Sequence, residues 1–260
     1  MTSILHLVCS PLGPASESYR LSEKIIGFLL EREPTASIIG RFIGGGALPH
    51  VDAGYAVALG APKPTSVEKL MEGSFSLSEE LIQELERADS VVIGTPMHNF
   101  TVPSALKAWI DHVVRVRRTF NLTREGKVAT LRDRPIFIAI SSGGRFSGAR
   151  ARQPDFLTPY LKAILGTIGL HDLTFFAIEG TGLGMDAVAE ARARAAQALL
   201  EHFSSRLISI PPPAPEQGHL EELLDDGLAQ TFPASDPVSS YLEEGRVSAV
   251  AAGSQVRSGG

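Results

Sequence analysis

Short apolar runs and longer helical stripes alternate along this chain. Five runs rich in β-branched and aromatic residues have the length of buried strands, at 3–8, 37–43, 90–94, 135–140 and 173–178. Between them, apolar residues recur at helical spacing and predict helices near 17–32, 76–88, 155–169 and 186–206, with a further helix on the stripe Leu106, Trp109, Ile110, Val113 and Val114. Strands that alternate with helices in this way form a parallel sheet with helices on both faces.

This order of elements predicts an α/β fold, a doubly wound five-stranded parallel sheet. Right-handed crossovers leave few topologies, and the flavodoxin-like strand order 2-1-3-4-5 is the natural candidate. In that order the loops after strands one, three and four lie side by side at the carboxyl edge of the sheet, where such folds bind ligands. The helix before the third strand is expected to begin near Ser76, because Ser76-Leu77-Ser78-Glu79 has capping-box spacing.

The composition changes near residue 210. The 260 residues are 43% hydrophobic and 20% charged, which suits a sizeable core. Residues 211–260 open with a proline-rich stretch, end in Gly and Ser, and carry eight acidic residues against two basic ones. We expect a domain over 1–210 and an acidic tail over 211–260. The tail is predicted to be disordered, or else loosely docked through Leu220, Leu223, Leu224 and Phe232.

Charge and cysteine content exclude several classes of protein. The net charge is −5 for the chain and −6 for residues 211–260, so the body is close to neutral and lacks the basic footprint of a nucleic-acid-binding protein. No apolar run approaches the roughly 20 residues that cross a membrane, and the first residues lack the features of a signal peptide. The one cysteine, Cys9, and the histidine spacing predict no metal site. We expect a cytoplasmic protein with neither nucleic-acid nor membrane partners.

The loop after the first strand has the residues of a phosphate site. Ser10 closes the strand, and Ser16, Glu17 and Ser18 stand at the start of the next helix. A helix N-terminus binds phosphate through its free N–H groups and its dipole, without Lys or Arg. Ser16 could instead only cap the helix. The loop contains neither GK[ST] nor GxGxxG, so it suits the terminal phosphate of a mononucleotide.

Two more loops offer contacts for a ring. After the third strand come Pro96-Met97-His98-Asn99-Phe100, where Met and Phe supply flat, polarisable surface and Asn99 can bond the edge of a heterocycle. His98 is a candidate for proton transfer, although a lone histidine more often packs or bonds structurally. After the fourth strand, Ser141-Ser142-Gly143-Gly144 lets the backbone approach a ligand closely, or forms an ordinary turn.

These stretches resemble a known family. SPLGPASES, PMHNFTVPSALKAWIDHVVRVRRTF and SSGG are similar to the FMN-dependent NADH:azoreductases, which are flavodoxin-like NAD(P)H:quinone oxidoreductases, and the resemblance spans about residues 3–206. It implies that FMN is the cofactor. The implied FMN contacts are Ser10 and Ser16-Glu17-Ser18 on the phosphate side, Pro96 and Met97–Phe100 along the isoalloxazine, and Ser141–Gly144 at its pyrimidine edge.

The chain departs from the family at two of these positions. His98 stands where the family usually has Tyr, and Ser142 where Arg is common, so the substrate pocket is expected to differ while flavin binding is kept. The chemistry belongs to FMN, so no catalytic residue is certain; His98, Asn99 and Phe120 are candidates. Phe120 either walls the substrate cavity or packs in the core. The Gly/Ala-rich segment 44–75 is a candidate lid.

The resemblance implies an enzyme, a homodimer that reduces quinones and azo compounds by two electrons with NAD(P)H as donor. No second dinucleotide motif occurs, so donor and oxidant are expected to use the same open flavin face in turn, by a ping-pong scheme. The alternative is a non-enzymatic flavodoxin-like FMN-binding electron carrier or regulatory module. The nearly neutral body and the candidate lid favour the enzyme. The physiological oxidant and the choice between NADH and NADPH stay open.

Overall fold

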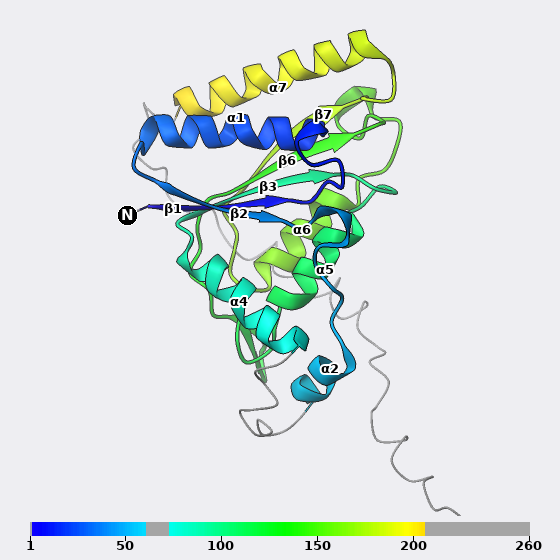
Figure 1. The fold of residues 1–260 in the computed structure, drawn as a ribbon. Helices are drawn as coiled ribbons and strands as arrows, with labels where there is room; N and C mark the ends of the chain where they lie inside the picture. The colour runs from blue at the N-terminus through cyan, green and yellow to red at the C-terminus, as the bar shows by residue number, and fades with distance from the viewer. Residues whose placement is uncertain (1, 61–72, 206–260) are drawn as a thin grey trace, which may run out of the picture. The chain divides into compact units, whose positions relative to one another are not determined.

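The computed structural model describes residues 2–60 and 73–205. They contain a five-stranded sheet in the order β2-β1-β3-β6-β7 (Figure 1). Neighbouring strands of this sheet are all parallel, as predicted. The strands are β1 (Ser3–Val8), β2 (Ser37–Phe42), β3 (Ser90–Pro96), β6 (Ile136–Ser142) and β7 (Leu173–Glu179).

Burial along each strand follows its place in the sheet. In the central strands β3 and β6, the residues are buried without a break over 90–95 and 136–140. The edge strand β2 has no buried residue. Strands covered on both faces read as continuous apolar runs, which is why the central strands are the easiest to recognise in the sequence.

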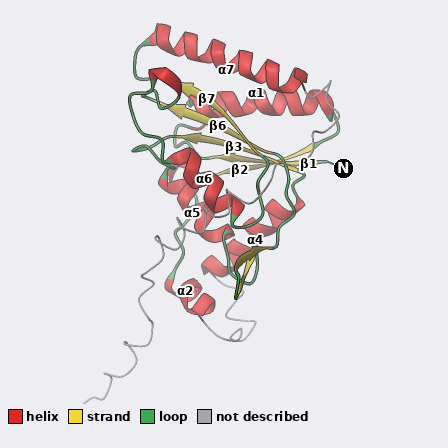
Figure 2. Ribbon diagram, turned by 180° about the vertical axis from the view of Figure 1, so that it is seen from behind, coloured by secondary structure: helices red, strands yellow, loops and turns green. Residues whose placement is uncertain are grey.

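Helices cover both faces of the sheet (Figures 1 and 2). α1 and α7 lie side by side on one face, and α4, α5 and α6 lie on the other. Trp109 of α5 is 1% exposed and is among the largest side chains in the core under that second layer. The helices are α1 (Glu17–Arg32), α2 (Ala53–Gly60), α4 (Gly73–Arg87), α5 (Ser104–Val113), α6 (Leu157–Gly166) and α7 (Met185–Ser205).

A hairpin between α5 and β6 was not predicted. It consists of β4 (Phe120–Thr123) and β5 (Gly126–Ala129), which pair antiparallel. Of its residues only Phe120 is buried, so the hairpin lacks the apolar pattern that marks a buried strand. Counted along the chain, the five parallel strands follow the expected 2-1-3-4-5 order, but the hairpin makes the last two of them β6 and β7.

The predicted start of α4 was wrong. The helix begins at Gly73, so Ser76 lies inside it rather than at its cap. The cap comes from a distant residue, Asp52, whose carboxylate accepts hydrogen bonds from the backbone N–H of Ser74 at 3.0 Å and of Tyr55 at 2.7 Å. One carboxylate therefore serves the first turns of both α2 and α4, a pairing that local sequence cannot reveal.

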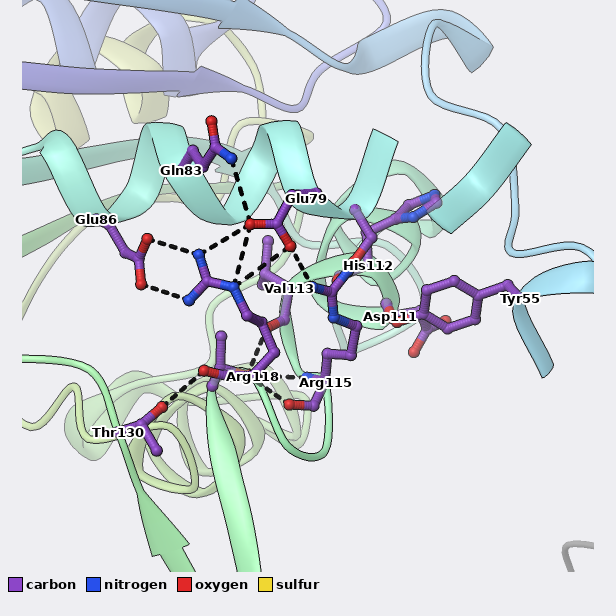
Figure 3. Close-up of polar contacts among 12 residues, drawn as sticks. Tyr55, Glu79, Gln83, Glu86, Asp111, His112, Val113, Arg115, Arg118 and Thr130 are labelled. Atoms are coloured by element: carbon purple, nitrogen blue, oxygen red, sulfur yellow. Dashed lines mark hydrogen bonds and ion pairs between the residues drawn. The ribbon is translucent and has the colours of Figure 1, made fainter. Parts of the chain in front are cut away.

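A buried arginine joins the end of α5 to α4 (Figure 3). The side chain of Arg115 is 4% exposed, donates to Ser78 Oγ at 3.0 Å and pairs with Glu79. Arg118 contacts the same Glu79 at 3.0 Å and Glu86 at 2.6 Å. Both carboxylates belong to α4, so this network holds α5 against α4, and α5 follows directly after the Pro96–Phe100 loop.

Some predictions fall partly outside the described residues. Within the candidate lid, 44–75, the structure describes a 3₁₀ turn at Gly44–Gly46, α2, the stretches around them and the first residues of α4, whereas residues 61–72 lie outside. The acidic tail, 211–260, also lies outside. Among the helices described, none has the length and apolar character needed to cross a bilayer.

Candidate functional site

Three loops meet at the carboxyl edge of the sheet. The strand register sets Val8 of β1 opposite Gly94 of β3, and Pro96 of β3 opposite Ser141 of β6. The backbone N–H of Met97 donates to Ser141 O at 2.8 Å, which ties the second loop to the third. β1, β3 and β6 end at the same edge (Figure 1). The structure therefore brings together the loops that the sequence analysis singled out.

The first loop presents the N-terminus of α1. Ser16 caps this helix, with Oγ accepting from Tyr19 N at 3.2 Å and donating to Gly13 O at 2.8 Å. Its Oγ also lies 3.4 Å from Ser18 Oγ. Ser10, Ser16 and Ser18 are all buried. Because the hydroxyl of Ser16 and the N–H of Tyr19 already have protein partners, the backbone N–H groups that precede Tyr19 in the first helical turn are the donors best placed for an anion.

Glu17 uses its carboxylate for an interhelical ion pair. It accepts from Arg192 Nε of α7 at 2.8 Å and from Arg20 at 2.8 Å. The hydrogen bond from Arg192 is the largest cause that holds the pKa of Glu17 below its usual value. A contact between Glu17 and a phosphate would therefore be made by the backbone N–H, with the carboxylate turned to α7.

A glycine allows the loop after β2 to lie on the first loop. A Cβ at Gly44 would stand 2.2 Å from the backbone oxygen of Ser10, so no other residue fits there. Gly13, at φ +52°, lies under the ring of Phe42. The first loop is thus supported from the β2 side, which fixes its backbone before any ligand arrives.

The second loop is a tight, strained turn. The backbones of His98 and Thr101 exchange two hydrogen bonds of 3.0 Å, and the two residues between them, Asn99 and Phe100, have φ of 48° and 71°. Positive φ at both central residues is normally a place for Gly, Asn or Asp. Phe100 is 43% exposed. An exposed aromatic in a strained conformation is typical of a functional loop.

The other residues of the second loop differ in how far they are buried. Met97 is 8% exposed and belongs to the core cluster, whereas His98 and Asn99 are exposed. Met97 therefore packs beneath the loop, with its sulfur 3.8 Å from Ser142 Oγ. His98 and Asn99 are accessible, as contact with a ligand requires, and their roles stay predictions.

The third loop is held by its carbonyl groups. The oxygens of Ser142, Gly143 and Gly144 accept hydrogen bonds of 3.0–3.1 Å from the backbone N–H groups of Thr181, Gly182 and Gly180, respectively. In a trans peptide the N–H points opposite to the preceding carbonyl. The N–H groups of Gly143 and Gly144 therefore point away from the 180–182 segment, as preorganised donors.

Gln153 was not predicted from the sequence, and the structure places it against the second and third loops. Its Nε2 donates to Ser142 Oγ at 3.0 Å and to Met97 Sδ at 3.2 Å. The same segment contacts the second loop again, where Phe156 N donates to Phe100 O at 3.0 Å. Gln153 lies in an irregular stretch without apolar periodicity, so its position could not be read from a pattern.

Two further residues that the sequence singled out, Phe120 and Cys9, are buried. Phe120 is 9% exposed and packs in the core cluster, with Lys127 Nζ 5.8 Å from its ring centroid. This favours the core interpretation of Phe120, and a role as cavity wall stays a prediction. Cys9 is fully buried, and burial raises the pKa of its thiol well above the usual range, so it is unreactive at neutral pH.

The three loops fit a flavin mononucleotide. The first offers a helix N-terminus flanked by hydroxyls, the second a thioether and an exposed aromatic, and the third two backbone N–H groups. The only charged side chain of the predicted phosphate positions, that of Glu17, is turned away to Arg192. Such a site binds a phosphate with neutral donors and a flat ring with apolar contacts.

Known proteins match almost the whole described chain. Residues 2–203 match a family described as having a flavodoxin-like fold. An "FMN-dependent NADH:quinone oxidoreductase 4" from Pseudomonas fluorescens is 46% identical over 188 residues, 72% of this chain and 89% of the relative. An "FMN-dependent NADH:quinone oxidoreductase 5" from Burkholderia lata is 44% identical over 200 residues, 77% of this chain and 96% of the relative.

Solved structures agree on the fold. A Bacillus anthracis azoreductase superposes with a TM-score of 0.68 at 22% identity, covering 79% of this chain and all of that protein. A B. anthracis FMN-dependent NADH-azoreductase, solved in complex with FMN, gives a TM-score of 0.64 at 24% identity, covering 80% of this chain and all of that protein.

Proposed function

Because this chain belongs to the family of flavodoxin-like proteins, we propose that it is an FMN-dependent NADH oxidoreductase that reduces quinones and azo compounds. The observation that carries the proposal is the meeting of three loops with neutral donors at the carboxyl edge of the sheet. The names of relatives at 46% and 44% identity support the same activity.

Each loop has one part in holding the cofactor. The first turn of α1 binds the phosphate through the N–H groups of Glu17 and Ser18, with Ser10 and Ser16 around it. The second loop, Pro96–Phe100, lines the isoalloxazine, and the third, Ser141–Gly144, faces its pyrimidine edge. These are the contacts that the resemblance to the azoreductases implies for FMN.

The chain binds and orients the cofactor, and FMN supplies the two-electron chemistry when bound. The N–H groups of Gly143 and Gly144 point away from the 180–182 segment, and in this proposal they donate to the edge of the ring that gains negative charge on reduction. One face of the ring must stay open for NADH and for the oxidant in turn, which predicts ping-pong kinetics. The backbone that receives the ring is already held by hydrogen bonds, so little reorganisation is needed.

Exposed apolar side chains near the same edge support a homodimer. Large apolar side chains follow the carboxyl ends of four of its strands and are at least 43% exposed: Leu12, Phe100, Phe156 and Leu183. Exposed apolar groups gathered at one edge mark an interaction surface. We expect a dimer by light scattering after gel filtration; a monomer at micromolar concentration would remove the dimer from the proposal. The cytoplasmic location stays a prediction.

The test of the activity is a reductive half-reaction followed by an oxidative one. The purified protein is loaded with FMN, and NADH is added without oxygen while the flavin absorbance is recorded. We expect prompt bleaching, and recovery of the absorbance when a quinone or an azo dye is added. Bound flavin that stays oxidised with both NADH and NADPH would instead support the electron carrier.

A further inference from the structure

Gln153 connects two of the loops through one side-chain amide. Its Nε2 lies 3.0 Å from Ser142 Oγ and 3.2 Å from Met97 Sδ. Ser142 is 3% exposed and Met97 is 8% exposed, so the amide rests on the floor formed by the loops after β3 and β6. Its backbone N–H is also fixed, since it donates to Arg145 O at 3.2 Å.

The amide lies directly over the third loop. A Cβ at Gly144 would stand 2.0 Å from Gln153 Oε1, so any side chain at Gly144 would displace Gln153. The glycine at this position leaves the space that the amide occupies. Both polar atoms of the amide lie among residues expected to face the ring.

One of the two amide donors has a weak partner. The Oγ of Ser142 is an ordinary acceptor, but a thioether sulfur accepts hydrogen bonds poorly. A carbonyl oxygen or ring nitrogen brought beside Met97 would take that N–H in preference to the sulfur, because hydrogen bonds to stronger acceptors contribute more. The structure thus leaves a positioned donor at the base of the site.

We propose that Gln153 contacts the polar edge of the flavin ring and stabilises its reduced form. This inference rests on the proposed function, because it needs FMN in the site. A donor at this edge interacts more strongly with the reduced ring, which carries negative charge, than with the oxidised ring. Gln153 therefore tunes how strongly the protein prefers reduced over oxidised FMN.

The experiment measures that preference in Gln153→Met and Gln153→Glu. Methionine keeps the length of the side chain and removes the donor, and glutamate keeps the shape and replaces the donor with negative charge. Titration of oxidised FMN and anaerobic spectroelectrochemistry together give the ratio of the two affinities. We expect the ratio of the affinity for reduced FMN to the affinity for oxidised FMN to fall about tenfold in Gln153→Met. For a two-electron couple this corresponds to a midpoint potential lower by about 30 mV. In Gln153→Glu the ratio should fall further.

The control is Gln197→Ala. Gln197 donates to Glu201 on the exposed surface of α7 at 2.8 Å, away from the loops, and this variant should keep the wild-type potential. If the potential stays at the wild-type value in the Gln153 variants that bind FMN, the inference is overturned while the proposed function stands. If neither folded variant binds FMN, Gln153 only shapes the loops and the inference also falls. Wild-type protein that binds no FMN would instead overturn the proposed function.

Discussion

At the scale of single residues, Phe100 holds a conformation that few side chains adopt. Its φ is 71° and Asn99 before it has φ of 48°. For a bulky L-residue the left-handed region costs about 1–2 kcal/mol. The turn keeps this residue although glycine would fit better, which indicates that the exposed ring has a use that outweighs the strain.

Phe100→Gly tests that interpretation. We expect the free energy of unfolding of the FMN-free protein to rise by about 1 kcal/mol, while FMN affinity falls because the ring contact is lost. Urea unfolding and FMN titration measure the two effects. Arg117, also at positive φ of 63°, lies outside the three loops, so Arg117→Gly should relieve strain and leave FMN affinity unchanged. Equal FMN affinity in both variants would contradict a flavin contact by Phe100.

A second residue sets a pH dependence. His6 of β1 is 5% exposed and its Nε2 lies 2.8 Å from Ser22 Oγ of α1. Burial lowers the pKa of His6 from 6.5 to about 4. The unfolded chain therefore binds a proton at a higher pH than the folded one, so stability is complete above pH 6.5 and is lost as the pH falls toward 4.

The corresponding measurement is the free energy of unfolding against pH. In the wild type, protonation of His6 should lower the free energy of unfolding by about 3 kcal/mol between neutral pH and pH 4. In His6→Gln this part of the pH dependence should be absent. His171 is exposed, and His171→Gln should follow the wild-type curve. A slope retained in His6→Gln would show that other groups cause it.

At the scale of elements, the joint between α4 and α5 depends on one carboxylate. Burial alone would raise the pKa of Glu79, but hydrogen bonds from Arg118 and Arg115 outweigh this effect and hold it at about 2. Arg115 is 4% exposed and Glu79 is 34% exposed. Losing the partner of a buried charge costs roughly 3–5 kcal/mol, and solvent around Glu79 reduces that figure.

Glu79→Gln should therefore lower the free energy of unfolding by about 2 kcal/mol. Glu80→Gln is the matched control, because Glu80 is 58% exposed and pairs with Arg41 at 2.5 Å. An exposed pair contributes less than about 1 kcal/mol. Chemical denaturation of both variants at neutral pH gives the comparison, and equal losses would mean that the buried arginine does not depend on Glu79.

At the scale of the whole molecule, the family match ends at residue 203 and the acidic excess begins after residue 210. We propose that residues 1–210 form the FMN-binding domain and that residues 211–260 are not needed for it. Every loop of the candidate site lies before residue 160, so the proposed domain contains all three of them.

A chain ending at Ile210 tests this division. We expect it to bind FMN with wild-type affinity and to keep the oligomeric state of the full chain. Fluorescence titration with FMN and gel filtration with light scattering measure the two properties. Loss of flavin or a change of oligomer would show that the acidic segment takes part in the site or in the interface.

The sequence by itself determined the parallel strands, most helices and the identity of the three loops. Buried strands and amphipathic helices have periods that appear directly in the order of residues, as in β3 and in the stripe around Trp109. Parallel strands also end at one edge of a sheet, so the loops could be assigned to one site. The long motif at 96–120, together with SPLGPASES and SSGG, carried the resemblance that implied FMN as the cofactor.

Only the tertiary structure decided contacts between segments far apart in the chain. The cap of α4 comes from Asp52, the carboxylate of Glu17 pairs with Arg192, and Gln153 rests on Met97 and Ser142. None of these pairings has a period or a local spacing, because each depends on how whole elements pack. The exposed hairpin β4–β5 escaped detection for a related reason, since a strand that buries almost nothing leaves no hydrophobic pattern.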